Sequence, residues 1–319
     1  MLLLALFIAC VSEEGTTADI SAPQLEYTVS GYYLNVEQAY TLGRKKDIEQ
    51  ARCALDRAFS LAKPLPGHLW FAAHLSDLAD DPAAVERYLV ESAANGYSPS
   101  KLQERFEVLT KTGNTTTRNA VEAAYQAWFS RRADHVTTQL INETYAVDQF
   151  VRRHIFKPNK TKDWAKAQLL RTDSLNLNAL MTHIEANGFP DRFEIDDATH
   201  RNLFVMLLHQ TTDIEEPRFQ KVDSLLRQQV HLGNLAPLQY AQINDRRRLW
   251  GQEAPVLYGT YNLTADRTLP AIEDVERLDK RRADIGLGPY VYFEEARERK
   301  LFDGYQPTVE FPHVKCFQK

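Results

Sequence analysis

Two side chains at the end of an apolar segment could form an acid–base pair. His209 and Asp213 are four residues apart, and on an α-helix that spacing puts both side chains on one face. If the helix continues through Asp213, His209 could act as a general base oriented by Asp213, or both could bind one metal ion. The alternative is structural, because a histidine leaving a buried helix needs a hydrogen-bond partner. We favour this alternative, since neither His183 nor His231 has a spacing that makes it a third metal ligand.

Three further side chains could complete a binding site. Arg246 follows Asp245 in a segment expected to be helical, where it could hold a carboxylate or phosphate or form a buried ion pair. Tyr258 and Thr260 flank Gly259, and a glycine in a strand marks a bulge or a close backbone approach. That approach could be to a ligand or to a neighbouring helix, and packing is favoured. In an enzyme, Arg246 would bind an anionic part of the substrate and Tyr258 would donate a proton or a hydrogen bond.

Composition limits the class of protein. The chain has 319 residues, of which 44% are hydrophobic and 25% charged, as in ordinary globular proteins. A net charge of −5 gives no field for holding nucleic acid, so we expect no nucleic-acid partner. No phosphate-binding loop, metalloprotease motif, nucleophile elbow or EF-hand loop is present, so we expect no cofactor and no metal. Three cysteines cannot form a disulfide framework, and Cys53 is expected to be a core thiol.

The N-terminus predicts a compartment. Its first nine residues, MLLLALFIA, are apolar, too short to span a bilayer as a helix but suited to the core of a secretory signal. The run ends at Ala9-Cys10 and resembles a bacterial lipoprotein signal, although no Lys or Arg precedes it. The resemblance implies that Cys10 is lipidated and that residues 1–20 are signal and tether. We expect a protein anchored by lipid in the bacterial cell envelope, periplasmic or at the cell surface. The alternative, a buried N-terminal strand, is less consistent with the polar residues that follow.

Residues 35–97 show a helical repeat. Apolar residues return every three or four positions, with two proline-containing breaks, which predicts two helical hairpins. Ala39 and Ala73 are 34 residues apart, as are Leu55 and Leu89. This period resembles that of tetratricopeptide helix pairs. The resemblance implies stacked hairpins that present a concave face to a protein or peptide partner.

Two hairpins are fewer than a stable stack requires, so another element must cover them. The candidates are the helical segments at 117–132 and 136–155. We therefore assign residues 21–160 to a tetratricopeptide-like helical region. A basic, proline-containing stretch then leads into a second helical domain at residues 161–319.

The second domain is predicted to be helical with one small β-hairpin, so the fold class is mainly α. Glycines close four of the five expected helices, and alternating apolar residues near 256–272 predict the hairpin. The expected helices run from Asp173 to Asn187, from Asp196 or Asp197 to Gln210, from Arg218 to Leu232, from Pro237 to Trp250 and from Asp274 to Ile285.

Residues 165–300 carry an ordered set of motifs. The set consists of Asp173, Asn178, Gly188-Phe189-Pro190, His209-Gln210 with Asp213, Phe219-Gln220, Asp245-Arg246, Leu257-Tyr258-Gly259-Thr260, Pro270, Ile272-Glu273-Asp274, Arg281-Arg282 and Ile285-Gly286-Leu287. It resembles a bacterial family catalogued only as a domain of unknown function. The family has Gln where this chain has Tyr261, and more often Trp where it has Phe189. The resemblance implies a shared helical fold and no established activity.

Two functions stay open at this point. The first is a lipid-anchored binding or assembly protein, with a helical platform and a C-terminal interaction module. The alternative is a hydrolase-like enzyme with a site made by His209, Asp213 and Arg246. The two hypotheses differ in space: an enzyme requires these groups and Tyr258 to converge on one open pocket.

Overall fold

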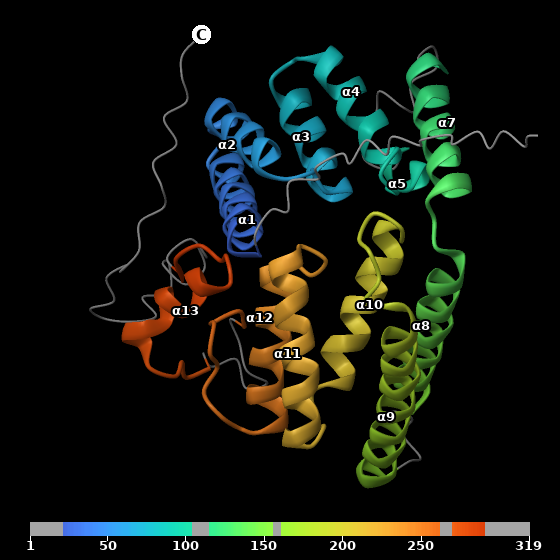
Figure 1. The fold of residues 1–319 in the computed structure, drawn as a ribbon, viewed down its shortest axis with the longest axis vertical. Helices are drawn as coiled ribbons and strands as arrows, with labels where there is room; N and C mark the ends of the chain where they lie inside the picture. Colours follow the sequence, from blue (N-terminus) through green and yellow to red (C-terminus); the bar gives the residue numbers. More distant parts are fainter. Residues whose placement is uncertain (1–21, 104–114, 156–160, 262–269, 291–319) are drawn as a thin grey trace, which may run out of the picture.

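The chain is mainly α-helical. The computed structural model describes residues 22–103, 115–155, 161–261 and 270–290 (Figure 1). The first layer of helices contains α1 (Ala22–Arg44), α2 (Ile48–Leu61), α3 (Pro66–Leu78), α4 (Pro82–Ala93), α5 (Pro99–Gln103) and α7 (Thr115–Arg131). The second layer contains α8 (His135–Ile155), α9 (Lys162–Asn187), α10 (Asp197–Gln210), α11 (Glu216–Leu232), α12 (Pro237–Arg246) and α13 (Leu278–Asp284). Short helical turns, η1 (Arg247–Gly251) and η2 (Val275–Arg277), follow α12 and precede α13.

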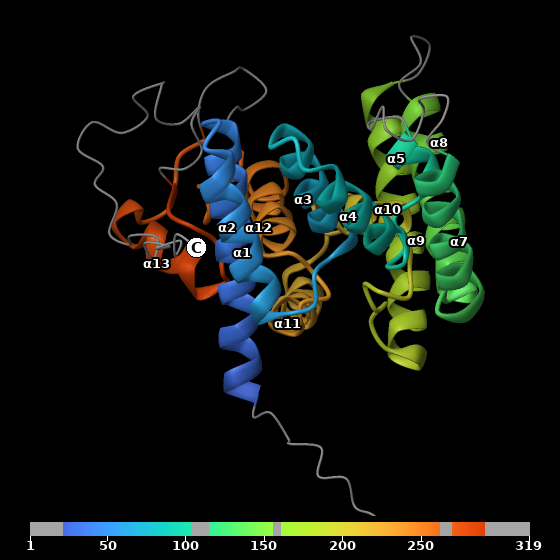
Figure 2. The ribbon, with the colours of Figure 1, turned by 90° about the horizontal axis from the view of Figure 1, so that it is seen from above.

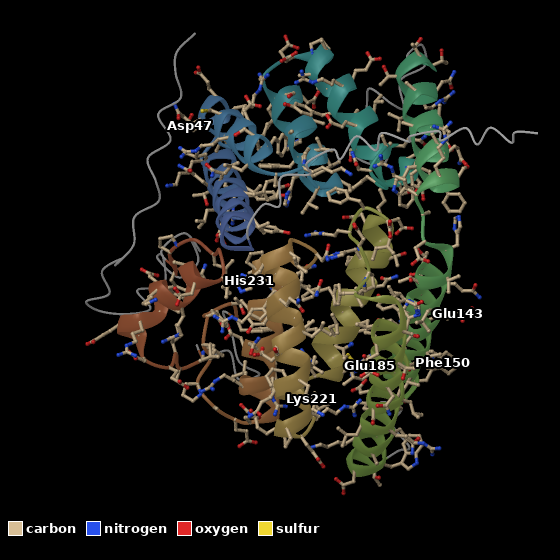
Figure 3. The ribbon with its side chains drawn as sticks, viewed as in Figure 1. Asp47, Glu143, Phe150, Glu185, Lys221 and His231 are labelled. Atoms are coloured by element: carbon tan, nitrogen blue, oxygen red, sulfur yellow. The ribbon has the colours of Figure 1, made fainter. Side chains whose placement is uncertain are left out.

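The first layer consists of helices paired along the chain. The α1–α2 pair lies at one side, the α3–α4 pair in the middle and α7 at the other side (Figures 1 and 2). The breaks are encoded locally, because Asp47 lies at the α1–α2 turn (Figure 3) and its carboxylate accepts from the Gln50 amide. Asp81 caps α4 in the same way, followed by Pro82 at the first helical position. These caps make helix starts that depend little on the rest of the molecule.

Residues 34 positions apart in the two hairpins are equally buried. Ala39 and Ala73 are each 0% exposed, and Leu55 and Leu89 are 1% and 0% exposed. They face two adjoining apolar clusters, one joining α1, α2 and α3 and the other joining α3, α4, α5 and α7. The hairpin faces are therefore covered by neighbouring helices of the same layer.

The two helices expected to cover the hairpins, α7 and α8, pack against different parts of the protein. α7 packs against α4, whereas α8 packs against α9 and α10. Ile141 of α8 lies in the large apolar cluster of the second layer, together with Leu180, Leu203 and Leu226. The apolar face of α8 therefore belongs to the core that holds the C-terminal helices.

Local signals set several helix ends of the second layer, although α12 ends at Arg246 and not at the expected Trp250. Gly188 ends α9, Asp196 caps α10 and Gly233 ends α11 in the left-handed region at φ 82°, which confirms three predicted ends. The predicted start at Asp173 is wrong. α9 begins at Lys162 with Thr161 as its cap, and the side chain of Asp173 pairs with an arginine instead of capping the helix.

The predicted β-hairpin is not formed by the residues that the structure describes. Val256 pairs with Ile272 in an isolated parallel bridge, whereas the strands of a hairpin are antiparallel. The expected turn, at 262–269, lies outside the described residues. The helix expected from Asp274 divides into η2 and α13.

Candidate functional site

His209 lies in the last turn of α10, and its hydrogen-bond partner comes from another helix. Its Nδ1 is 3.1 Å from Oδ2 of Asp148 on α8. The Asp148 side chain is 1% exposed and that of His209 is 17% exposed. An ionised carboxylate can only accept, so Nδ1 carries the hydrogen and a neutral His209 has Nε2 as its acceptor. This is the orientation that a general base or a hydrogen-bonding ligand contact requires.

Arg152 connects this pair to a second carboxylate. Its Nε donates to Asp148 Oδ1 over 2.9 Å and its Nη2 donates to Asp173 Oδ1 on α9 over 2.6 Å. Burial acts to raise the pKa of Asp148, but hydrogen bonding by His209 and the charge of Arg152 hold that pKa below its usual value. Burial raises the pKa of Asp173 in spite of Arg152. We call Asp148, Arg152, Asp173 and His209 the ion network, which fixes α8, α9 and α10 relative to one another.

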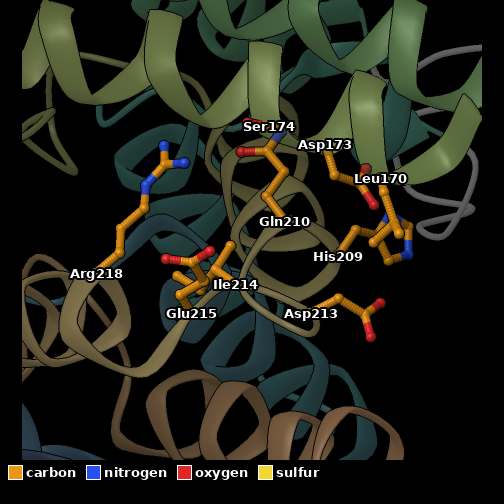
Figure 4. A pocket seen from close by; sticks show the side chains of 9 residues that line it. All are labelled: Leu170, Asp173, Ser174, His209, Gln210, Asp213, Ile214, Glu215 and Arg218. Atoms are coloured by element: carbon orange, nitrogen blue, oxygen red, sulfur yellow. The ribbon is translucent and has the colours of Figure 1, made fainter. Parts of the chain in front are cut away.

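A pocket of about 360 Å³ opens on one side of this network. It lies between α9, α10 and the start of α11, and in Figure 4 His209 and Asp173 are on one side and Arg218 on the other, with Gln210 between them. We call it the His209 pocket. Its wall is formed by Leu170, Asp173, Ser174, His209, Gln210, Asp213, Ile214, Glu215 and Arg218. The wall contains both signs of charge, and Arg218 donates to Asn178 Oδ1 over 2.6 Å.

The pair expected from the four-residue spacing takes a different form. His209 and Asp213 line the same pocket, but α10 ends at Gln210 with Thr211 as its C-cap. Asp213 is exposed in the turn that follows, and Figure 4 shows its side chain directed away from Gln210. The carboxylate that hydrogen-bonds to His209 is that of Asp148, so the expectation that Asp213 orients His209 is wrong.

The other predicted site residues lie away from the lining of this pocket. Arg246 Nε donates to Thr212 Oγ1 over 3.1 Å, and its guanidinium lies over the Trp250 ring at 4.9 Å. Tyr258 is 8% exposed and packs edge-on against Tyr240, with the ring centroids 6.1 Å apart. The structure therefore does not bring Arg246 and Tyr258 together with His209 in one pocket.

Asp245 explains the motif around Tyr258. Its carboxylate is fully buried and accepts from the backbone N–H groups of Leu257, Tyr258 and Thr260 over 2.7, 2.9 and 2.8 Å. The hydroxyl of Thr260 donates to the same carboxylate over 2.8 Å. Gly259, at φ 67°, lies against the ring of Tyr290, where a Cβ would collide. The Tyr-Gly-Thr segment is held against α12 by hydrogen bonds, and Thr260 has a structural role.

Arg282 joins this segment to the first layer of helices. It is 0% exposed, and it donates to the carbonyls of Gly288 and Tyr258 over 2.6 and 2.8 Å. Its Nη2 is 3.6 Å from Glu37 Oε1 of α1, and the other oxygen of Glu37 accepts from the Gly288 amide over 2.6 Å. We call Asp245, Arg282 and Glu37, with the backbone they bind, the sealed joint. The charged side chains of the sealed joint bind groups in the interior of the protein.

Sequence reasoning missed Asp148 and Arg152. They are four residues apart on α8, a spacing that does indicate an ion pair on a helix. Nothing local shows that this pair faces His209, which lies 61 residues beyond Asp148 along the chain. The packing of α8 on α10 makes that contact.

Two other histidines, His68 and His200, are buried in the fold. His68 is buried beside Tyr32, whose hydroxyl is 2.6 Å from His68 Nδ1. Burial, reinforced by the positive charge of Arg192, lowers the pKa of His68 to about 3. His200 is buried too, and its pKa is lowered to about 3 for the same reasons. Both side chains are neutral packing residues at physiological pH.

Cys53 differs from its prediction. It is half-buried and disulfide-bonded, so it is not a core thiol. Cys10, the expected lipidation site, and Cys316 lie outside the described residues. Within the described ranges, His, Cys, Asp and Glu side chains do not gather in groups of three or more that could hold a metal ion. None of the helices in those ranges has the length and hydropathy needed to cross a bilayer.

No family model, curated protein or solved structure matches this chain. The site must therefore be interpreted from its own geometry.

Proposed function

We propose that this chain is a binding protein of the bacterial cell envelope, anchored by lipid at Cys10, whose C-terminal module holds a small polar ligand in the His209 pocket. The pocket lining supports the proposal. Polar groups from α9, α10 and α11 surround one open space, and the partly buried ion network fixes two of them, Asp173 and His209. Preorganised polar groups in a concave site are what ligand recognition requires.

Three observations support the envelope assignment. The apolar run that ends at Cys10 has the length of a secretory signal core. The described helices include none that could cross a bilayer, and acyl chains on Cys10 would by themselves supply an anchor. Cys53 is disulfide-bonded, and structural disulfides persist in oxidising compartments such as the periplasm.

The paired helices of the first layer favour a second surface. The hairpins α1–α2 and α3–α4 bury equivalent residues 34 positions apart, as in tetratricopeptide-like stacks. We propose that this layer is a platform for a protein or peptide partner, and that the C-terminal module belongs to the family of unknown function that its motifs resemble.

A hydrolase-like activity is the alternative, and the hydrogen bond from His209 to Asp148 favours it. This contact leaves Nε2 of His209 as the group that could accept a proton in the pocket. Asp213 lines the same pocket and could position water. Arg246 would have to act from outside the lining, whereas Arg218 is already in place. The binding hypothesis needs no reaction and is therefore preferred.

A ligand screen tests the binding proposal. The full mature chain and its His209→Gln variant are heated with a panel of small polar compounds, and the melting temperature is recorded. A ligand that binds only the native state raises that temperature. We expect at least one compound to stabilise the wild type and not the variant. Enzymatic turnover of that compound would favour the hydrolase hypothesis. Equal stabilisation of the wild type and the His209→Gln variant would mean that the ligand binds outside the His209 pocket.

A separate experiment tests the anchor. Cells that express the chain or its Cys10→Ser variant are fractionated, and the mature N-terminus is analysed by mass spectrometry. We expect the wild type in the membrane fraction with acyl chains on Cys10 and the variant without them. An intact Met1 with an unmodified Cys10 would contradict lipidation.

A further inference from the structure

Gln210 is the polar residue of the His209 pocket that the protein leaves unsatisfied. It is 1% exposed, and neither its Oε1 nor its Nε2 has a hydrogen-bond partner. Figure 4 shows its side chain extending from α10 toward Ser174 on α9, between His209 and Arg218. A buried amide without partners costs free energy that an apolar side chain of the same length would not cost. The residue is thus poorly suited to packing alone.

Three other polar side chains around it already have partners inside the protein. His209 is bonded to Asp148, Asp173 to Arg152 and Arg218 to Asn178. The amide of Gln210 offers one donor edge and one acceptor edge side by side. A group that satisfies both must itself present an acceptor and a donor side by side.

The charges of the lining disfavour one class of such a group. Three carboxylic residues of the pocket wall, Asp173, Asp213 and Glu215, outnumber its one arginine, Arg218. Arg218 is already bonded to Asn178, so the wall disfavours an incoming carboxylate. A carboxylate would also offer acceptors only, which leaves Oε1 of Gln210 without a donor. An uncharged group is therefore the better match.

We propose that the His209 pocket recognises an uncharged primary amide or ring lactam, which pairs with the amide of Gln210 through two hydrogen bonds. The apolar part of the ligand contacts Leu170 and Ile214, which also line the pocket. Both amide atoms of Gln210 are nearly covered, so pairing requires the side chain to turn toward the cavity. This inference rests on the proposed binding function and specifies the chemistry of its ligand.

Benzamide, acetophenone and benzoate provide a matched set of probes. All three contain a phenyl ring. Benzamide presents a donor and an acceptor, acetophenone presents an acceptor alone, and benzoate presents two acceptors that carry a negative charge. Each is titrated into the full chain labelled with ¹⁵N, and the dissociation constant and the side-chain amide signals of Gln210 are followed by NMR. We expect benzamide to bind about tenfold tighter than either control, since one added hydrogen bond changes affinity by roughly that factor. The Gln210 signals should shift most with benzamide, because it alone also donates to Oε1.

The Gln210→Met variant is the matched protein control. Methionine has a similar length and no hydrogen-bonding amide, so the variant should lose the preference for benzamide. Its midpoint of unfolding in urea should equal or exceed that of the wild type, because an unsatisfied buried amide has been removed.

Three results would overturn the inference. A lower unfolding midpoint for Gln210→Met would mean that the amide has a stabilising partner. Equal affinities of the three probes for the wild type would show a pocket that binds without amide recognition, and the proposed binding function would stand. Failure of all three probes to bind would contradict amides as the ligand class. The wider ligand screen would then still test the binding function.

Discussion

The sealed joint and the His209 pocket contain the same types of charged side chain, but the two regions differ in exposure and in hydrogen bonding. In the joint, Asp245 and Arg282 are both 0% exposed, and they bind backbone groups of the segments they hold. In the pocket, His209 is partly exposed and Gln210 lacks partners. The difference teaches that charge and motif membership alone do not mark a functional site. Exposure and unsatisfied hydrogen bonding distinguish the pocket from the joint.

The largest expected effect comes from breaking the joint. Asp245→Ala removes the acceptor of three backbone N–H groups and one hydroxyl. We expect the free energy of unfolding to fall by about 3–5 kcal/mol, because buried donors are left without partners. Urea unfolding followed by circular dichroism measures this loss. Asp213→Ala, at an exposed position of the pocket, should change stability by about 0.5 kcal/mol or less. Similar losses of unfolding free energy in Asp245→Ala and Asp213→Ala would contradict the proposed difference between the sealed joint and the pocket.

A pH titration sharpens the comparison for buried groups. The pKa of His68 is lowered to about 3 in the folded protein, whereas an unfolded histidine titrates near about 6.5. The unfolded state therefore binds more protons between those values, and stability falls as the pH decreases from about 6.5 toward 3. The slope is about 1.4 kcal/mol per pH unit. His68→Gln should reduce the slope of unfolding free energy against pH in this window. An unchanged slope would show that His68 is protonated in the fold.

The ion network should contribute less than the joint. The pKa of Asp148 is held below its usual value, so its stabilisation is present above the unfolded pKa of about 3.9 and is lost as the pH falls through the lower folded pKa. We expect Asp148→Asn to lose about 1–3 kcal/mol at pH 7. The gap between variant and wild type should narrow at pH 3. Unfolding curves at both pH values measure it, and a gap that widens in acid would contradict the assignment.

The smallest effect on stability is expected in the pocket itself. His209→Gln keeps a donor that can reach Asp148 and removes the ring from a partly exposed position, so stability should change by less than about 1 kcal/mol. Ligand affinity should nevertheless fall by about tenfold, the value of one lost hydrogen bond. Thermal shift with a ligand identified for the wild type gives this number. A large loss of stability would place His209 with the structural residues of the joint.

Several features of the fold were predictable because their causes are local. A mainly α fold follows from apolar periodicity, and Asp196, Gly188 and Gly233 set helix ends through caps and backbone conformation. The start of α9 was not predictable from Asp173, because a carboxylate in mid-helix looks like a cap until its distant partner is known. Of the residues that line the pocket, the sequence predicted only His209 and Asp213 as site residues. The orientation of His209 depends on its hydrogen bond to Asp148.

The sequence by itself determined several of the helix ends and the apolar faces of the helices, since these properties act within a few residues. Tertiary structure alone decided that His209 meets Asp148, that Asp245 holds the Tyr-Gly-Thr segment and that Gln210 is buried without a partner. The physical reason is that hydrogen bonds between side chains act over about 3 Å. Only the packing of helices far apart in the chain brings such groups within that distance.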